Sequence, residues 1–125
     1  MTNKEMNDLY ENLITLQDTI LPCQISFAVK KNLLFLETAL KPFFQERAAL
    51  VQRYGAKDDK NKLIIKEDGT IDIPNGKEYL KELSLLETID CKDFVEHQIT
   101  KSDLNSINSD MTPRQLGVLM QIVKE

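Results

Sequence analysis

The hydrophobic pattern is most regular between Ile25 and Tyr54, and it predicts one long helix there. Apolar residues repeat in alternating steps of four and three, interrupted only by Arg47, and this spacing places them along one seam of a helix. The seam consists of Val29, Leu33, Leu36, Leu40, Phe43, Leu50 and Tyr54. The reverse side is also apolar and carries Phe27, Ala28, Leu34, Phe35, Pro42, Ala48 and Ala49. Because a surface helix needs only one apolar stripe, we expect this helix to be covered twice, by its own fold or by another subunit.

A shorter helix is predicted before the long one, from a cap at Asn3 to about Leu21. Pro22 ends it, because proline lacks an amide donor and disfavours helix in the residue before it. The short gap to the next helix predicts an antiparallel helical hairpin over residues 1–55. We expect Pro42 to kink the long helix without breaking it, since the seam continues beyond it. The seam of the first helix is Met6, Leu9, Leu13, Leu16 and Ile20.

Three short strands are predicted in the second half of the chain. Residues 63–66 and 70–73 are apolar runs on either side of Glu67-Asp68-Gly69, which predicts a β-hairpin whose glycine has a positive φ. The alternating run from Phe94 to Thr100 predicts a third strand. A polar connection over residues 101–110 follows it.

Two further helices are predicted beside these strands. The first covers residues 76–88 and begins with a capping-box pair, Asn75 and Glu78. Its inward side is expected to carry Tyr79, Leu80, Leu83 and Leu86. The second begins at Thr112-Pro113, which is a good cap and first-turn pair. We expect it to turn one apolar side inward, formed by Leu116, Leu119, Met120 and Val123.

These elements together predict an α+β fold in a single domain, residues 1–125. The antiparallel helical hairpin, residues 1–55, is expected to join a small, mostly antiparallel three-stranded sheet and two further helices in residues 56–125. A chain of 125 residues, 42% of them hydrophobic, fits one core of ordinary size.

The charge distribution argues against a nucleic-acid protein that works through bulk electrostatics. The formal net charge is −4, and charges of both signs are interspersed along the chain. No apolar stretch approaches the ~20 residues that span a bilayer, and the first residues do not resemble a signal peptide. We therefore expect a protein of the cytoplasm, in a host cell cytosol, without a membrane partner.

No group of residues predicts catalytic chemistry. Cys23 and Cys91 lie far apart in the sequence, and His97 is the only histidine. A structural zinc site needs about four ligands, and no serine, cysteine or carboxylate is tied to the histidine by a motif. We expect no enzyme activity, no catalytic or metal-binding residues and no cofactor. His97 is expected to pack on the same face as Val95 and Ile99.

The candidate interaction surface combines exposed apolar positions of the long helix with cations. Arg47 has two interpretations: its stem packs while its head reaches solvent, or it pairs with a carboxylate of another helix and fixes register. Lysines around the hairpin could bind a nucleotide phosphate or an RNA, but acidic residues lie between them and no aromatic platform accompanies them. The candidate residues are Phe27, Leu34, Phe35, Arg47, Lys57, Lys60, Lys62 and Lys66.

The order of elements suggests a family. A long helix ending at Tyr54-Gly55, a charged connection and short hairpin, and a closing helix led by Thr112-Pro113 resemble small uncharacterised proteins encoded by bacteriophages and prophages. The resemblance implies no activity, but it favours non-catalytic binding. The function that it suggests is inhibition of a host antiviral defence, by masking a protein surface or sequestering a signal molecule. The alternative is a virion assembly factor or chaperone. The expected partner is a host protein or a second copy of the chain.

Overall fold

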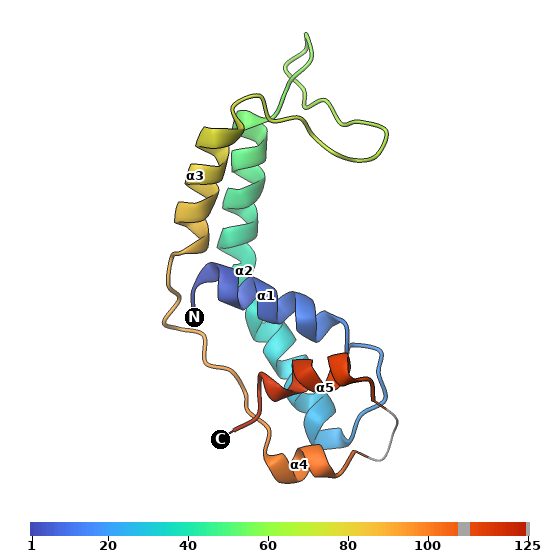
Figure 1. The fold of residues 1–125 in the computed structure, drawn as a ribbon. Coiled ribbons are helices and arrows are strands. Elements are labelled where there is room, and N and C mark those ends of the chain that lie inside the picture. The colour runs from blue at the N-terminus through green and yellow to red at the C-terminus, as the bar shows by residue number, and fades with distance from the viewer. Residues whose placement is uncertain (108–110, 125) are drawn as a thin grey trace.

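The computed structural model describes residues 1–107 and 111–124, which form an elongated, helical molecule (Figure 1). The longest helix is its axis. A shorter helix crosses the N-terminal half of that axis obliquely and in the opposite sense, and another lies along the C-terminal half. Two short helices gather near the first turns of the axis. In chain order these are α1 (Asn3–Ile14), α2 (Cys23–Tyr54), α3 (Gly76–Glu87), α4 (Lys101–Asn105) and α5 (Pro113–Met120).

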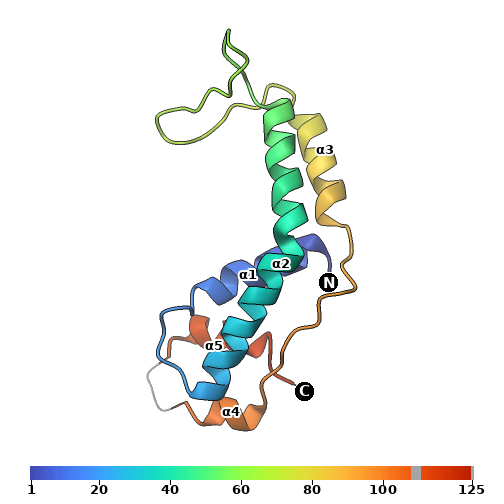
Figure 2. The same ribbon diagram turned by 180° about the vertical axis from the view of Figure 1, so that it is seen from behind.

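The core lies along the predicted seam of the long helix. Leu36 and Leu40 are completely buried in the middle of α2, and Leu13 is completely buried on the facing side of α1. The helix continues through Pro42, as predicted, and Figure 2 shows its axis changing direction in the middle part. Other buried members of the two seams are Met6, Leu9, Leu16, Val29, Leu33, Phe43 and Leu50.

The first helix differs from the prediction at both ends. Its N-cap is Thr2 and not Asn3, because the Thr2 hydroxyl accepts from the backbone of Glu5 and the Glu5 carboxylate accepts in return. The helix ends at Ile14 instead of Leu21, since the backbone bonds of the next residues close back over three positions and tighten into turns. Ile20, predicted to be in the seam, is consequently 90% exposed.

The prediction of an α+β fold with a three-stranded sheet is wrong, since the described residues contain only isolated β-bridges. The predicted hairpin is reduced to the pair Ile65 and Ile71, although its Gly69 has the expected positive φ of 84°. A two-stranded hairpin without a third strand or a covering helix is marginal. The third strand cannot join it, because residues 94–100 lie beside the other half of α2 (Figure 1).

The predicted third strand is an extended segment held by a side chain instead of by a sheet. Asn32 of α2 is completely buried, and its side chain donates to the His97 carbonyl oxygen at 2.9 Å and accepts from the His97 backbone N–H at 2.6 Å. Ile99 forms the one backbone bridge of this stretch, with Val123. An amide side chain therefore supplies the donor and the acceptor that a neighbouring strand would supply.

The helix at residues 76–88 is confirmed almost to the residue, but its details differ. Asn75 makes no side-chain cap hydrogen bond, so the predicted capping box is wrong. Leu80, predicted to point inward, is 62% exposed. The reason is that α3 packs along one side on α2, its end meets the start of α1, and no further helix of the described residues covers its other side (Figures 1 and 2).

The C-terminal part contains one helix more than predicted. The connection predicted over residues 101–110 begins with α4, which is capped by Thr100; its last residues, 108–110, lie outside the described residues. The Thr112-Pro113 start of α5 is confirmed by a capping box with Gln115. The inward side of α5 differs in part from the predicted one: Leu119 is buried as predicted, but Leu116 and Met120 are exposed, and Val118 is buried instead.

Truncation of a buried side chain in the seam should lower the stability of the fold. We expect Leu36→Ala to lower the free energy of unfolding by about 2–5 kcal/mol, because it leaves a cavity at a completely buried position. The matched control is Leu34→Ala, on the same helix at a 62% exposed position, with an expected loss below about 0.5 kcal/mol. Urea unfolding followed by circular dichroism measures both, and equal losses would contradict the assignment of the seam.

Removal of the Asn32 amide should release the extended segment. In Asn32→Leu the N–H and C=O of His97 lose their partners, and we expect a loss of about 2–4 kcal/mol in unfolding free energy. Hydrogen exchange should show faster exchange of the His97 amide than in the wild-type protein. Asn7→Ala is the control, because Asn7 makes only an exposed 3.4 Å contact to Glu11. An unchanged His97 exchange rate would show that the amide does not hold the segment.

Candidate interaction surface on α2

The reverse side of α2 is not covered by the rest of the chain. Phe27 is 56% exposed, Leu34 62% and Phe35 45%, whereas Ala28 is the buried exception. In Figure 2 α2 lies in front of α1 and α5. The fold thus covers one of the two apolar sides. We call the uncovered side the outer α2 surface; it consists of Phe27, Lys31, Leu34, Phe35, Thr38, Lys41, Pro42, Gln45, Ala48 and Ala49.

A groove runs along this surface between α2 and the extended segment. Its volume is about 900 Å³. One wall comes from α2 and is formed by Leu34, Phe35, Thr38, Ala39 and Pro42; the other is formed by Cys91, Asp93, Phe94 and Val95. Val95 is 77% exposed, so the second wall adds apolar area to the outer α2 surface instead of covering it.

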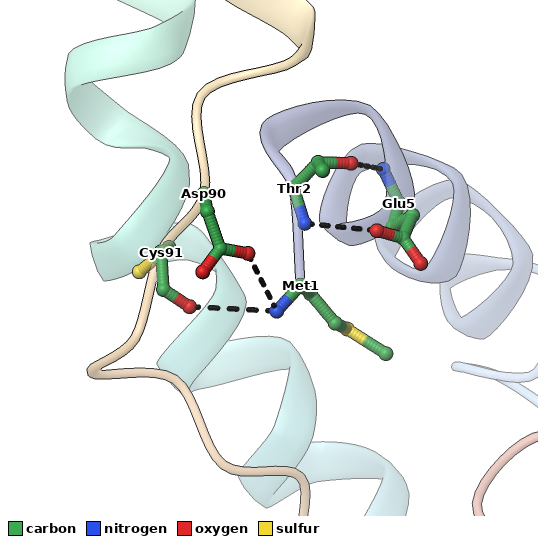
Figure 3. Close-up of polar contacts among 5 residues, drawn as sticks. All are labelled: Met1, Thr2, Glu5, Asp90 and Cys91. Atoms are coloured by element: carbon green, nitrogen blue, oxygen red, sulfur yellow. Dashed lines mark hydrogen bonds and ion pairs between the residues drawn. The ribbon is translucent and has the colours of Figure 1, made fainter.

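The extended segment is fixed at both ends of the groove. At one end Asn32 binds the His97 backbone, and the His97 ring meets the Phe27 ring edge-on with centroids 5.6 Å apart. At the other end the Cys91 N–H donates to the Met1 carbonyl at 2.8 Å. The Met1 amino group lies 3.4 Å from Asp90 and 3.5 Å from the Cys91 carbonyl oxygen (Figure 3). The position of the second wall is therefore set by contacts outside the groove.

The start of α1 stabilises this N-terminal contact. Figure 3 shows Thr2 and Glu5 joined by their reciprocal hydrogen bonds directly beside Met1. The hydrogen bond from the backbone N–H of Thr2 lowers the pKa of the Glu5 carboxyl, with a smaller contribution from the Thr2 hydroxyl. The lowered pKa means that the ionised carboxylate, which is the form that accepts this hydrogen bond, is favoured further into the acid range.

The outer α2 surface is positively charged as well as apolar. The Lys31 Nζ lies 5.8 Å from the ring centroid of Phe27 and 5.7 Å from that of Phe35, so the ammonium bridges two exposed aromatic rings. Lys41 is exposed about two turns beyond Leu34 and Phe35. Glu37 and Glu46 lie at the two edges of the surface by helical periodicity.

Arg47 lies on the seam side of α2, away from the outer α2 surface. Its guanidinium is 5.1 Å from the Phe43 ring centroid and 5.2 Å from that of Phe44. It is half-buried, and within residues 1–107 and 111–124 it makes no ion pair. This geometry agrees with an arginine whose stem packs and whose head stacks on aromatic rings.

The predicted lysines lie in the loop between α2 and α3, residues 56–75, at the far end of the molecule (Figure 1). They do not adjoin Phe27, Leu34 or Phe35. Lys66 is paired with Asp72 at 2.7 Å, and Asp58 accepts from two backbone N–H groups of its own turn. Lysines and carboxylates alternate along the loop, which therefore does not form a basic patch; Lys57, Lys60 and Lys62 are exposed.

The groove residues of the extended segment were missed by sequence reasoning. Alternation placed Val95 on a buried face with Ile99, but only Ile99 is buried, at 2% exposure. The two neighbouring apolar residues Phe94 and Val95 were the available signal for an exposed apolar position. Two consecutive apolar residues in an extended segment place one apolar side chain on each of its faces.

No known protein family, curated protein or solved structure matches the chain. Within the described residues no cluster of three or more potential metal ligands is present, and none of their helices is long and apolar enough to cross a membrane. The groups that the outer α2 surface presents are aromatic and aliphatic side chains with two ammonium groups, and such groups bind by burial of apolar area and by charge.

The two thiols should differ in reactivity. Cys23 is exposed at the start of α2, whereas Cys91 is half-buried in the groove wall. We expect a thiol reagent such as DTNB to modify Cys23 several-fold faster. Cys23→Ser should remove the fast phase and Cys91→Ser the slow one. A single rate shared by both thiols would contradict the position of Cys91.

Proposed function

We propose that the protein is a non-catalytic binding protein of the host cell cytoplasm, and that it acts through the outer α2 surface. The observation that carries the proposal is the apolar surface beside a groove of about 900 Å³, on the side of α2 that the fold leaves open. Monomeric proteins rarely expose contiguous apolar areas of this kind without using them in an interaction. The groove walls are fixed by hydrogen bonds outside it, so the surface is formed before a partner arrives.

Burial of the exposed apolar side chains would contribute a measurable part of the affinity for a partner. Full burial of one large apolar side chain contributes about 1.5–3 kcal/mol, so the exposed fractions of Phe27, Leu34 and Phe35 contribute roughly 1 kcal/mol each. Since 1.4 kcal/mol corresponds to a tenfold change in affinity, these three residues together account for a factor of about 100 in Kd.

The resemblance to phage-encoded proteins directs the proposal to a host antiviral defence. We propose inhibition by masking a protein surface of the defence system. The apolar composition of the outer α2 surface favours a protein over a nucleotide signal, which needs more polar and cationic groups. The alternative is a role in virion assembly, which the same experiment distinguishes.

The test is phage growth on a panel of hosts that each carry one antiviral defence, with and without the protein. We expect the wild-type protein to restore plating on at least one of these hosts. Leu34→Glu should abolish the effect, because it puts a charge into the apolar surface. The matched control is Leu80→Glu on α3, which is also 62% exposed but lies outside the groove.

Three results would count against the proposal. Failure to protect phage on any host of the panel would remove the defence assignment. Equal activity of Leu34→Glu and wild type would remove the outer α2 surface as the site. A loss of phage yield on a host without defences, when the protein is absent, would favour the assembly role instead. Circular dichroism melting of both variants controls for folding.

A further inference from the structure

We propose that the outer α2 surface pairs with the same surface of a second copy of the chain, with the two α2 helices antiparallel around a two-fold axis at Thr38. The inference rests on the proposed function, because it identifies an occupant of the same surface. The surface is complementary to itself in side-chain size and in charge.

The first observation is a second heptad pattern on the outer side of α2. Its positions advance by alternating steps of four and three, which is the spacing of a helix–helix seam. All but Lys31, which is half-buried against the aromatic rings, are exposed in the isolated chain. The positions are Phe27, Lys31, Leu34, Thr38, Lys41, Gln45 and Ala48.

The second observation is complementarity in size. The half of the pattern before Thr38 contains the large exposed apolar residues Phe27 and Leu34, whereas the only apolar residue of the half after it is the small Ala48. In a parallel pair large residues would face large ones. In an antiparallel pair around Thr38, positions equally far before and after it lie opposite each other, so Phe27 faces Ala48 and Ala49 of the second copy and Leu34 faces Pro42.

The third observation is complementarity in charge. In the same arrangement Lys31 faces Gln45 of the second copy, with Glu46 beside it at the edge of the surface. On the other edge Lys41 approaches Glu37, whose carboxylate is oriented by a hydrogen bond from the Tyr10 hydroxyl at 3.3 Å. The two-fold axis repeats each pair, so four opposite-charge contacts flank the apolar centre.

The size of the surface determines how tight the pair is. Positions 27–49 span about 33 Å along the helix, and the helix is about 10 Å wide, so α2 contributes roughly 330 Å² from each copy. The exposed Val95 beside it adds to this area. Stable interfaces bury about 1,200–2,000 Å² in total, so we expect a reversible dimer whose population depends on concentration.

The two uses of the surface are therefore in competition. A partner that binds the outer α2 surface displaces the second copy. While the partner is absent, the dimer covers the apolar side chains of this surface. This arrangement accounts for a small protein that exposes Phe27, Leu34 and Phe35 on one side of a single chain.

The test is disulfide trapping at the proposed axis, in a background with Cys23→Ser and Cys91→Ser. Thr38→Cys places a thiol opposite its own symmetry mate, so mild oxidation should give a covalent dimer. Gln45→Cys is the matched control on the same exposed side: in the antiparallel pair its symmetry mate is about 21 Å away, because it is fourteen positions along the helix. Trapping of both variants to the same extent, or of neither, would overturn the proposal.

Charge reversal provides a second measurement that does not depend on cysteines. The mass in solution, from light scattering over a range of protein concentrations, should rise toward that of a dimer. Lys31→Glu and Glu46→Lys should each weaken the dimer by about tenfold in Kd, and the double variant should restore it. A monomer at every concentration, or a double variant no tighter than the single ones, would overturn the pairing.

The outcomes separate this inference from the proposed function. If trapping at position 38 succeeds but the protein protects phage on no host, the pairing stands and the function fails. If the protein is monomeric yet Leu34→Glu abolishes protection and Leu80→Glu does not, the function stands and the pairing fails.

Discussion

The side-chain amide of Asn32 makes the contact on which the position of the extended segment, and so of the groove wall, depends. It is completely buried and satisfies both backbone groups of His97, 65 positions away in the chain. Without it, an extended segment with no neighbouring strand would carry an unpaired N–H and C=O against a helix, which costs about 1–3 kcal/mol for each buried group. Because the segment is held there, Phe94 and Val95 form a groove wall and not a loose loop.

The long helix α2 contributes to both the core and the outer α2 surface. Its seam side builds the core with α1 in one half and meets α3 in the other. Its outer side carries the large apolar residues in one half and smaller apolar residues in the other, with one lysine in each half. A single 32-residue helix thus connects the stability of the fold to the surface on which binding is proposed. Changes in the seam act on stability, while changes on the outer side act on association.

Several features of the helices were predictable because helix formation is governed by local spacing. The steps of three and four placed most of the buried apolar residues of α1 and α2 correctly, although Ile20 is exposed and Ala28 is buried on the opposite side from the seam. The pair Thr112-Pro113 marked the start of α5. Helix ends were less predictable. Thr2 competes with Asn3 as the first cap, and Asn3 instead uses its side chain to donate to the Leu86 carbonyl of α3, a contact that no local pattern contains.

The sheet and the interaction surface were decided at the level of tertiary structure. Alternation shows that residues 94–100 are extended, but whether an extended segment pairs with a strand or with a side chain depends on which groups come within hydrogen-bond reach. Here the hairpin and the segment lie at opposite ends of α2, and Asn32 takes the place of a strand. The pattern also identified α2 as apolar on two sides. Only the packing of α1 and α3 on the seam determined which of those sides is buried. The sequence could not decide this, because the two sides of the helix are similar in hydrophobicity.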